Sequence, residues 1–125
     1  MQINLPDVKA EVEAAFAAYE AALVGNDVDT LQALFWDSGL TIRYGTGENL
    51  YGIAEIAAFR AARSPLGLAR TTSRTVITTF GRDFATASTL FHRSPDRVGR
   101  QMQTWARMPD GWRVVAAHVS VIDAT

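Results

Sequence analysis

The fold is decided by residues 70–122, which read RTTSRTVITTFGRDFATASTLFHRSPDRVGRQMQTWARMPDGWRVVAAHVSVI. Three turn signals divide this stretch: Gly81-Arg82-Asp83, Ser94-Pro95-Asp96 and Pro109-Asp110-Gly111. Runs bounded by such clusters predict strands, and short turns between consecutive strands predict an antiparallel meander. We therefore expect strands over residues 70–80, 84–93, 99–108 and 112–122.

The chain ahead of this meander is mainly helical. Apolar residues recur at steps of three and four from Val8 to Leu23, which predicts an amphipathic helix with Pro6 near its start. Gly25-Asn26 ends that helix. Two further helices are expected: a short one capped by Asp27 or Asp29 that turns Leu31, Leu34 and Phe35 inward, and one over residues 52–63 that Ser64-Pro65 ends.

Helices followed by a meander predict an α+β domain, with about three helices packed on one face of a strongly curved, mostly antiparallel sheet. A length of 125 residues fits one domain over residues 1–125. A curved sheet with a helix across its mouth forms a cone. Such a cone is a natural pocket for a small molecule.

Composition restricts the partners. The net charge of −1 favours neither nucleic acid nor an anionic membrane surface. Of the 12 basic residues only Lys9 is a lysine, so the other eleven are arginines, and ten of these lie between Arg60 and Arg113. A local cluster of forked guanidinium donors suits a small anion.

Other classes of site find no support in the sequence. There is no cysteine, so disulfides, thiol catalysis and thiolate metal sites are excluded. Two distant histidines argue against zinc, and no glycine-rich phosphate loop is present; we expect neither a metal nor a cofactor. With no export signal and no apolar run of roughly 20 residues, we expect a soluble cytoplasmic protein without membrane contacts.

Arg43 is the first candidate site residue. It lies in Leu40-Thr41-Ile42-Arg43-Tyr44, a β-prone run before the turn-rich residues 45–49. Strand alternation places Arg43 on the face opposite to Ile42 and Tyr44. The usual position of such an arginine is a solvated sheet face. A concave sheet would instead point the guanidinium, with its forked donors, at a bound carboxylate.

Tyr19 is the second candidate. It lies in the centre of the apolar stripe of the first helix, so its ring faces the sheet. One interpretation is a core tyrosine whose hydroxyl finds a single partner. The other is a phenol that projects into the cone as a proton donor, next to Arg43 as an anion clamp.

The last two strands supply further candidates. Alternation places His118 and Ser120 on one face of the final strand, together with Trp112, Val114 and Ala116; this face is predicted to be a cavity wall or an interface. On the strand before it, Gln101, Gln103, Trp105 and Arg107 share a face. They suit a polar cavity lining, an exposed sheet face or a dimer surface. A catalytic, a structural and an interface role all stay open for His118.

Several arginines flank the third helix and the loop after it. Arg60, Arg63, Arg70 and Arg74 are candidates for substrate capture, with solvated helix-end positions as the alternative. His92, beside Arg93 and a turn, is expected to be solvated. Glu48 and Asp37 are the acids near the Arg43 strand, and they do not form a carboxylate pair.

The order of elements resembles the nuclear-transport-factor-2-like (NTF2-like) superfamily over the whole chain. Six segments are similar to the AtzH/HpxZ-like family within it: Phe16-Ala17-Ala18-Tyr19-Glu20, Arg43-Tyr44-Gly45, Tyr51-Gly52-Ile53, Ala58-Phe59-Arg60, Gly99-Arg100-Gln101-Met102-Gln103-Thr104-Trp105 and Gly111-Trp112-Arg113-Val114-Val115-Ala116-Ala117-His118-Val119-Ser120. The last two are long and distinctive.

This resemblance implies a metal-independent enzyme of bacterial ureide catabolism. The activity attributed to the AtzH branch converts 1,3-dicarboxyurea to allophanate in cyanuric acid breakdown, a decarboxylating amidohydrolase step. The tyrosine and the arginine that the family uses match Tyr19 and Arg43. We expect Arg43 to bind a substrate carboxylate and Tyr19 to donate a proton. Trp105, His118, Ser120, Arg70 and Gln101 are expected to contribute to substrate binding.

Two other functions stay open. The HpxZ branch is linked to oxalurate and purine-ureide catabolism, which would suit a non-catalytic binding protein that works beside an amidase-signature enzyme. Isomerase or dehydratase chemistry occurs elsewhere in the superfamily and would need His118 or an acid as a base. The resemblance also implies at least a homodimer.

Overall fold

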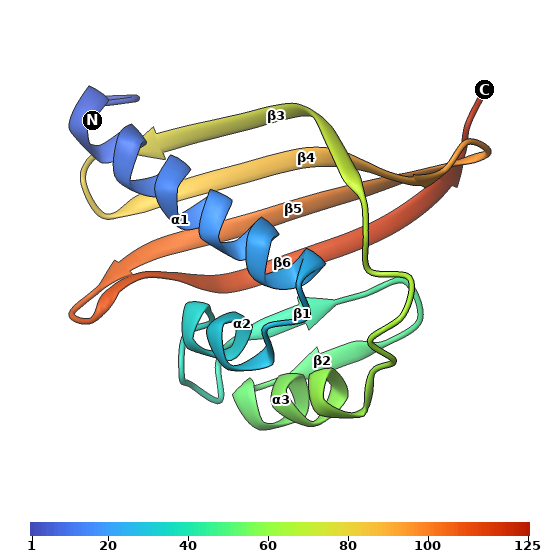
Figure 1. Ribbon diagram of the computed structural model, residues 1–125. Helices are drawn as coiled ribbons and strands as arrows, with labels where there is room; N and C mark the ends of the chain where they lie inside the picture. Colours follow the sequence, from blue (N-terminus) through green and yellow to red (C-terminus); the bar gives the residue numbers. More distant parts are fainter.

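The computed structural model describes all residues from 1 to 125. Three helices pack on one side of a single six-stranded sheet, so the predicted α+β class is confirmed (Figure 1). In chain order the elements are α1 (Pro6–Val24), α2 (Val28–Leu34), β1 (Ile42–Tyr44), β2 (Asn49–Tyr51), α3 (Ile53–Ala62), β3 (Thr71–Phe80), β4 (Phe84–Ser94), β5 (Arg97–Met108) and β6 (Gly111–Asp123).

The strands follow the order β2-β1-β6-β5-β4-β3. The four long strands β3 to β6 form the predicted antiparallel meander. The short strand β1 adds to β6 in parallel, with Arg43 opposite Ala117. Strand β2 was not predicted, because it has only three residues and begins at Asn49 in a stretch whose composition is typical of a turn.

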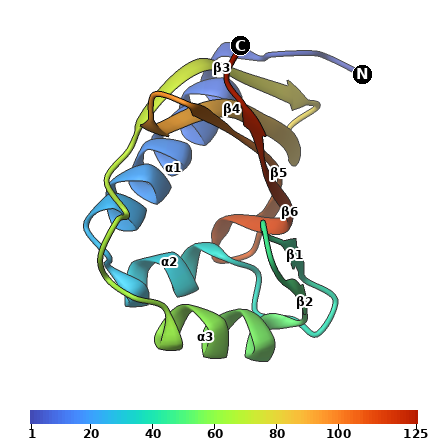
Figure 2. The same ribbon diagram turned by 90° about the vertical axis from the view of Figure 1, so that its right-hand side faces the viewer.

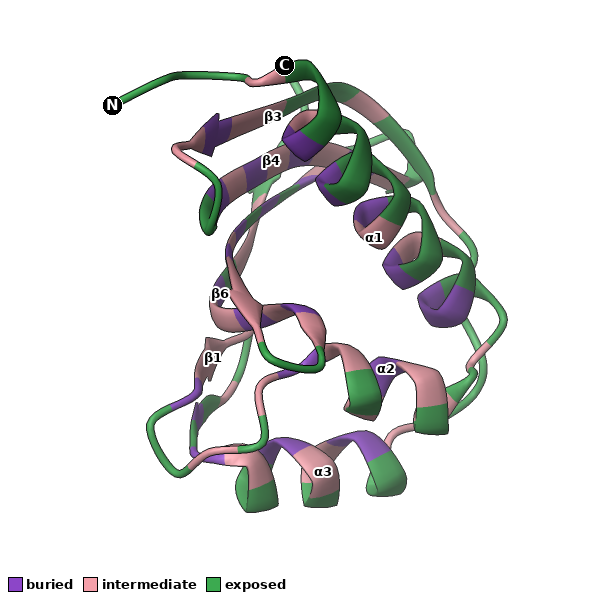
Figure 3. Cartoon of the chain, turned by 90° about the vertical axis from the view of Figure 1, so that its left-hand side faces the viewer, coloured by how far each residue is buried: buried purple, intermediate pink, exposed green.

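Helix α1 crosses the concave side of the sheet, and α2 and α3 close the end of the cone near β1 and β2 (Figure 2). The stripe predicted from the sequence is the buried one: Val8, Val12, Phe16, Tyr19 and Leu23 all face the sheet. Figure 3 shows this buried stripe turned toward the interior, with the exposed side of α1 facing outward. The helix thus roofs the space that the curved sheet encloses.

The hydrophobic core lies between α1, α2 and the middle of the sheet, and Trp105 of β5 is one of its fully buried members. The indole Nε1 donates a hydrogen bond of 3.1 Å to Gln103 Oε1, so the one polar atom of the ring is satisfied. Beyond this core, toward Phe91 on β4 and Gln101 on β5, the inner face of the sheet carries both polar and apolar side chains.

A bulge in β6 changes the side-chain pattern of that strand. Thr104 pairs with Ala116, but Trp105 pairs with Val114, so Val115 has no partner on β5. An extra residue in one strand reverses the alternation beyond it. Trp112 and Val114 therefore point inward ahead of the bulge, whereas Ala117, Val119 and Val121 point inward after it.

None of the three helices combines the length and the apolar character that a membrane span requires.

Candidate functional site

A cavity of about 290 Å³ lies under the C-terminal half of α1, inside the cone. Its walls come from α1, the end of α3, the loop before β3, the turn after β1 and the inner faces of β4, β5 and β6. Ligand pockets span roughly 300–1,000 Å³, so this volume suits a small ligand. Four arginines line it: Arg43, Arg63, Arg70 and Arg93.

Arg43 lines this cavity, which corresponds to the concave-face alternative of the sequence analysis and not to the solvated one. Its Nη1 donates to Glu48 Oε1 at 2.9 Å, and its guanidinium lies 5.5 Å from the centre of the Phe59 ring. Glu48 is carried by the turn between β1 and β2, where Gly45 N donates to the Glu48 carbonyl at 2.9 Å. The carboxylate thus holds one edge of the guanidinium and leaves Nη2 and Nε free of hydrogen bonds within the protein.

Tyr19 reaches the same cavity from α1. The residue is only 4% exposed, and its ring packs against Phe35 with 6.2 Å between ring centres. The hydroxyl makes no hydrogen bond to another protein group, although a buried tyrosine usually finds a partner. The structure therefore brings Tyr19 and Arg43, which lie on a helix and a strand far apart in sequence, to one space.

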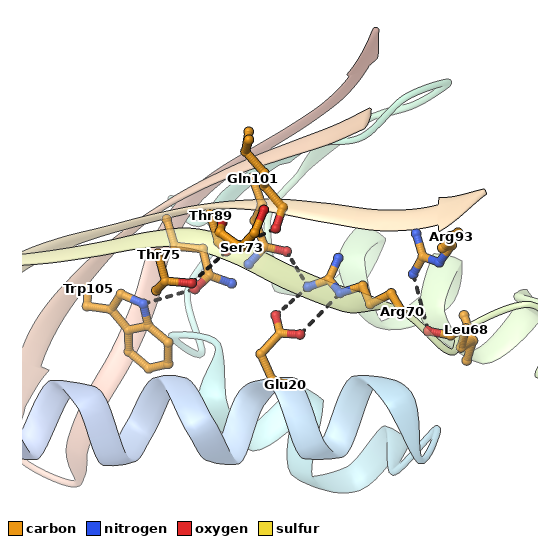
Figure 4. A network of polar contacts seen from close by, with 11 residues as sticks. Glu20, Leu68, Arg70, Ser73, Thr75, Thr89, Arg93, Gln101 and Trp105 are labelled. Carbon is orange, nitrogen blue, oxygen red and sulfur yellow. Dashed lines mark hydrogen bonds and ion pairs between the residues drawn. The ribbon is translucent and has the colours of Figure 1, made fainter. Parts of the chain in front are cut away.

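Arg70 and Gln101 form a fixed polar cluster at the cavity wall (Figure 4). Arg70 Nε donates to Glu20 Oε2 at 3.1 Å, and Arg70 Nη2 contacts both Glu20 Oε1 and, at 2.9 Å, Gln101 Oε1. The guanidinium also lies 4.4 Å from the centre of the Phe91 ring. Because Arg70 is paired on two edges, its main role in the structure is to position its neighbours. Gln101 Nε2 is buried and makes no hydrogen bond.

Arg63 and Arg93 have no carboxylate partner. The Nε and Nη2 atoms of Arg63 are buried without any hydrogen bond. Arg93 makes one long contact, 3.5 Å from Nη2 to the Leu68 carbonyl, and lies 5.0 Å from the centre of the Phe91 ring (Figure 4). Sequence reasoning did not place Arg93 in the site. It named Arg63 as a candidate for substrate capture, with a solvated helix end as the alternative. The only signal for Arg93 was the clustering of arginines between residues 60 and 113.

The charges of the cavity do not balance. Glu48 neutralises Arg43 and Glu20 neutralises Arg70, so two guanidinium groups are left uncompensated. Burial lowers the pKa of Arg63, and the charge of Arg43 lowers it further. Burial also lowers the pKa of Arg93, with the charges of Arg70 and Arg63 adding to the effect. The negative charge of a bound anion would favour the charged form of both arginines and so act against both pKa shifts.

Three of the expected binding residues lie elsewhere. His118 and Ser120 are on the outer face of the sheet, because the Val115 bulge reverses the alternation on which their placement rested. His118 stacks edge-on against Tyr44, and the Ser120 hydroxyl accepts from Arg100 Nε at 3.1 Å. Trp105 does face inward, but it is part of the core and does not line the cavity.

The other arginines and His92 also differ in part from expectation. Arg60 is not solvated: it is buried against the Phe35 ring, 4.7 Å from the ring centre, and burial lowers its pKa to about 10. Arg74 is exposed, at the irregularity of β3. His92 is half-buried, with Nε2 2.7 Å from the Ser73 hydroxyl. No histidine, aspartate or glutamate side chains form a group of three or more that could hold a metal.

Comparison with protein-family models identifies the family. The AtzH-like model matches residues 1–125, the whole chain. This chain belongs to the AtzH-like family. Comparison with curated proteins gave no match.

Two solved structures are similar to this AtzH-like chain over almost its whole length. It is 60% identical to a DUF3225-family protein of unknown function from Pectobacterium atrosepticum, with a TM-score of 0.94 over 96% of this chain and 94% of that one. It is 51% identical to a cystatin-like fold protein from Burkholderia xenovorans, with a TM-score of 0.95 over 100% and 99% of the two chains.

More distant structures share the NTF2-like fold of this AtzH-like protein. An NTF2-like superfamily protein from Salmonella enterica is 24% identical, with a TM-score of 0.74 over 91% of this chain and 90% of that chain. At this identity the likeness concerns the fold alone. The same fold serves many functions, so the function has to be argued from the cavity.

Proposed function

We propose that this AtzH-like protein binds a small dianionic ureide in the arginine-lined cavity and removes one of its carboxyl groups. The proposed substrate is 1,3-dicarboxyurea, and the proposed product is allophanate. The observation that carries the proposal is the meeting of an unpartnered phenol, Tyr19, with two uncompensated arginines in one small cavity.

Arg43 binds and orients one carboxylate of the substrate. Its Nη1 is held by Glu48, which fixes the plane of the guanidinium and leaves the other donors for a ligand. An arginine held in this way offers two parallel N–H groups to the two oxygens of a carboxylate. The pair with Glu48 also lowers the ordering cost on binding, because the arginine is already in place.

The chemical step needs a proton at a nitrogen. The bond between the urea nitrogen and the departing carboxyl carbon breaks, its electron pair stays on the nitrogen, and the carboxyl group leaves as CO₂. The nitrogen takes one proton from the Tyr19 hydroxyl, and water reprotonates the phenolate. A positioned acid of this kind contributes roughly 10²–10⁴-fold to a rate.

No nucleophile is required for this route. The carboxylates of the cavity region, Glu20 and Glu48, are both engaged in ion pairs. His118, which a dehydratase or isomerase mechanism would need as a base, lies on the outer face of the sheet. The cavity therefore favours proton donation to a leaving nitrogen over proton abstraction from carbon.

A coupled assay for allophanate tests the proposal. An amidase generates 1,3-dicarboxyurea in place, because this compound decays on its own, and allophanate is measured with and without the protein. Acceleration above the spontaneous rate is expected. If the folded protein gives no acceleration, the reaction is wrong and a non-catalytic ureide-binding role beside an amidase takes its place.

A further inference from the structure

We propose that Arg63 and Arg93 form a second carboxylate site, distinct from Arg43, which makes the cavity selective for dicarboxylates over monocarboxylates. This inference deepens the proposed function and rests on it for the identity of the natural ligand. The site itself is argued from unpaired donors, and it can be tested with ligands that do not react.

Arg63 is the first half of this site. It follows the last turn of α3, and its guanidinium lines the cavity with Nε and Nη2 buried and unbonded. A charged donor that is buried without a partner is costly, so such a group is retained where something else pairs with it. Nε and Nη2 form one edge of the guanidinium, the edge that grips both oxygens of a carboxylate.

Arg93 is the second half. It comes from the end of β4, is exposed, and lines the same cavity. Its contact with the Leu68 carbonyl, at 3.5 Å, is at the limit of hydrogen-bonding distance. Arg63 lines the same cavity, so the two guanidinium groups face one enclosed space. Two cations held together in this way attract an anion between them.

The remaining cavity arginines cannot replace this pair. Arg70 is committed to Glu20 and Gln101, and Arg43 is committed on one edge to Glu48. The unbonded Gln101 Nε2 adds a neutral donor to the same wall. The cavity thus offers one arginine on β1 whose charge is neutralised but whose Nε and Nη2 are free, and one pair without a carboxylate partner, which fits a ligand with a carboxylate at each end.

The cationic pair holds the carboxylate that stays on the product. Decarboxylation moves negative charge from the departing carboxylate to the urea nitrogen. Strong cationic contacts to the departing group would stabilise the ground state more than the transition state and slow the reaction. The same contacts to the retained carboxylate hold the substrate without this penalty.

Glutarate and pentanoate test the site without any turnover. Glutarate has the same five-atom chain between its carboxylate oxygens as 1,3-dicarboxyurea, and pentanoate lacks one of its two carboxylates. Isothermal titration calorimetry at low ionic strength gives the affinity of each. The protein is expected to bind glutarate at least about tenfold more tightly than pentanoate. Equal affinities, or no binding of glutarate at millimolar concentrations, would overturn the inference.

The variants assign the preference to the two arginines. In the double variant Arg63→Gln/Arg93→Gln, the affinity for glutarate is expected to fall to roughly the affinity for pentanoate. Each single variant should lower the ratio of the two affinities about threefold or more. Arg82→Gln is the matched control, since Arg82 is an exposed arginine paired with Asp7 outside the cavity. A preference that survives in the double variant contradicts the assignment.

A loss of binding in the variants can be distinguished from a loss of folding. Removing a charge that has no carboxylate partner is not expected to lower the melting temperature, in contrast to removing one partner of a buried ion pair. If the double variant does not fold, the single variants decide the question. If the protein prefers glutarate but produces no allophanate, the proposed reaction is wrong and the second carboxylate site is supported. If the protein produces allophanate but shows no such preference, the proposed reaction is supported and the second carboxylate site is wrong.

Discussion

The ring of Phe91 lies directly on the backbone of Gly99, its partner on the neighbouring strand. A Cβ added to Gly99 would stand 2.1 Å from two atoms of the ring. On the inner face, Arg70 and Arg93 both lie over this ring, at 4.4 and 5.0 Å from its centre. The absence of a side chain at residue 99 therefore lets the Phe91 ring lie close to the sheet. The position of the ring in turn determines where the guanidinium groups of Arg70 and Arg93 lie.

Gly99→Ala is expected to weaken ligand binding from outside the cavity. The methyl group would displace the Phe91 ring, and the two arginines above it would move with it. Overpacking of this kind costs about 1–3 kcal/mol of stability. Glutarate affinity and the free energy of unfolding should both fall. Gly47→Ala is the control, because nothing lies within 4 Å of a Cβ there. Unchanged affinity in a folded Gly99→Ala protein would contradict the coupling.

Gly45→Ala is expected to act on Arg43 through Glu48. A Cβ at residue 45 would stand 1.7 Å from Glu48 Oε1, so the flexible carboxylate has to leave its place beside the guanidinium. The fold should persist, while turnover falls about tenfold because Arg43 is no longer held in one orientation. Steady-state kinetics and melting temperature give the two readouts. Gly39→Ala, where a Cβ meets nothing, should leave both unchanged.

Tyr19→Phe is expected to remove the proton donor without harm to the fold. The ring keeps its packing against Phe35, and no protein group loses a hydrogen-bond partner. Turnover of 1,3-dicarboxyurea should fall by at least about 10²-fold. Tyr44→Phe, on the outer face where the hydroxyl contacts Tyr51, should retain the wild-type rate. A near-normal rate in Tyr19→Phe would show that the proton comes from elsewhere.

Glu20→Ala is expected to be strongly destabilising. Arg70 has only 2% of its side chain exposed, and it would lose the carboxylate that compensates its charge. Breaking a buried pair by removing one partner costs about 3–5 kcal/mol. Chemical denaturation measures this loss. Asp7→Ala breaks an exposed pair with Arg82 and should have no measurable effect, so a similar result for both variants would contradict the prediction.

Acid is expected to weaken the cap of α2. The Asp27 carboxylate accepts from Thr30 N at 3.1 Å and from the Thr30 hydroxyl at 2.6 Å, and these bonds lower its pKa below 3.8. A lowered folded-state pKa means that the stabilisation is present above pH 3.8 and is lost as the pH falls through the folded value. The melting-temperature gap between wild type and Asp27→Ala should therefore be large near pH 6 and narrow toward pH 3. Asp27→Asn, which keeps an acceptor without a charge, should show no such titration.

Local patterns in the sequence predicted most of the fold. The meander, the three helices and the buried stripe of α1 follow from periodicity and from turn residues, which act over a few positions. The face of β1 that carries Arg43 followed from alternation in a strand without a bulge, and the curvature of the sheet turned that face toward the cavity. The same rule failed for His118 and Ser120, because one unpaired residue, Val115, reversed it.

The sequence by itself determined the class of the fold, the family and the two residues, Tyr19 and Arg43, that the family pattern singled out. Tertiary structure alone decided which arginines reach the cavity and which are neutralised there. Pairing across 50 residues, as between Glu20 and Arg70, leaves no local pattern, because it depends on how far the sheet curves. The charges of Arg63 and Arg93 are uncompensated because the fold pairs the nearby carboxylates with the other two cavity arginines.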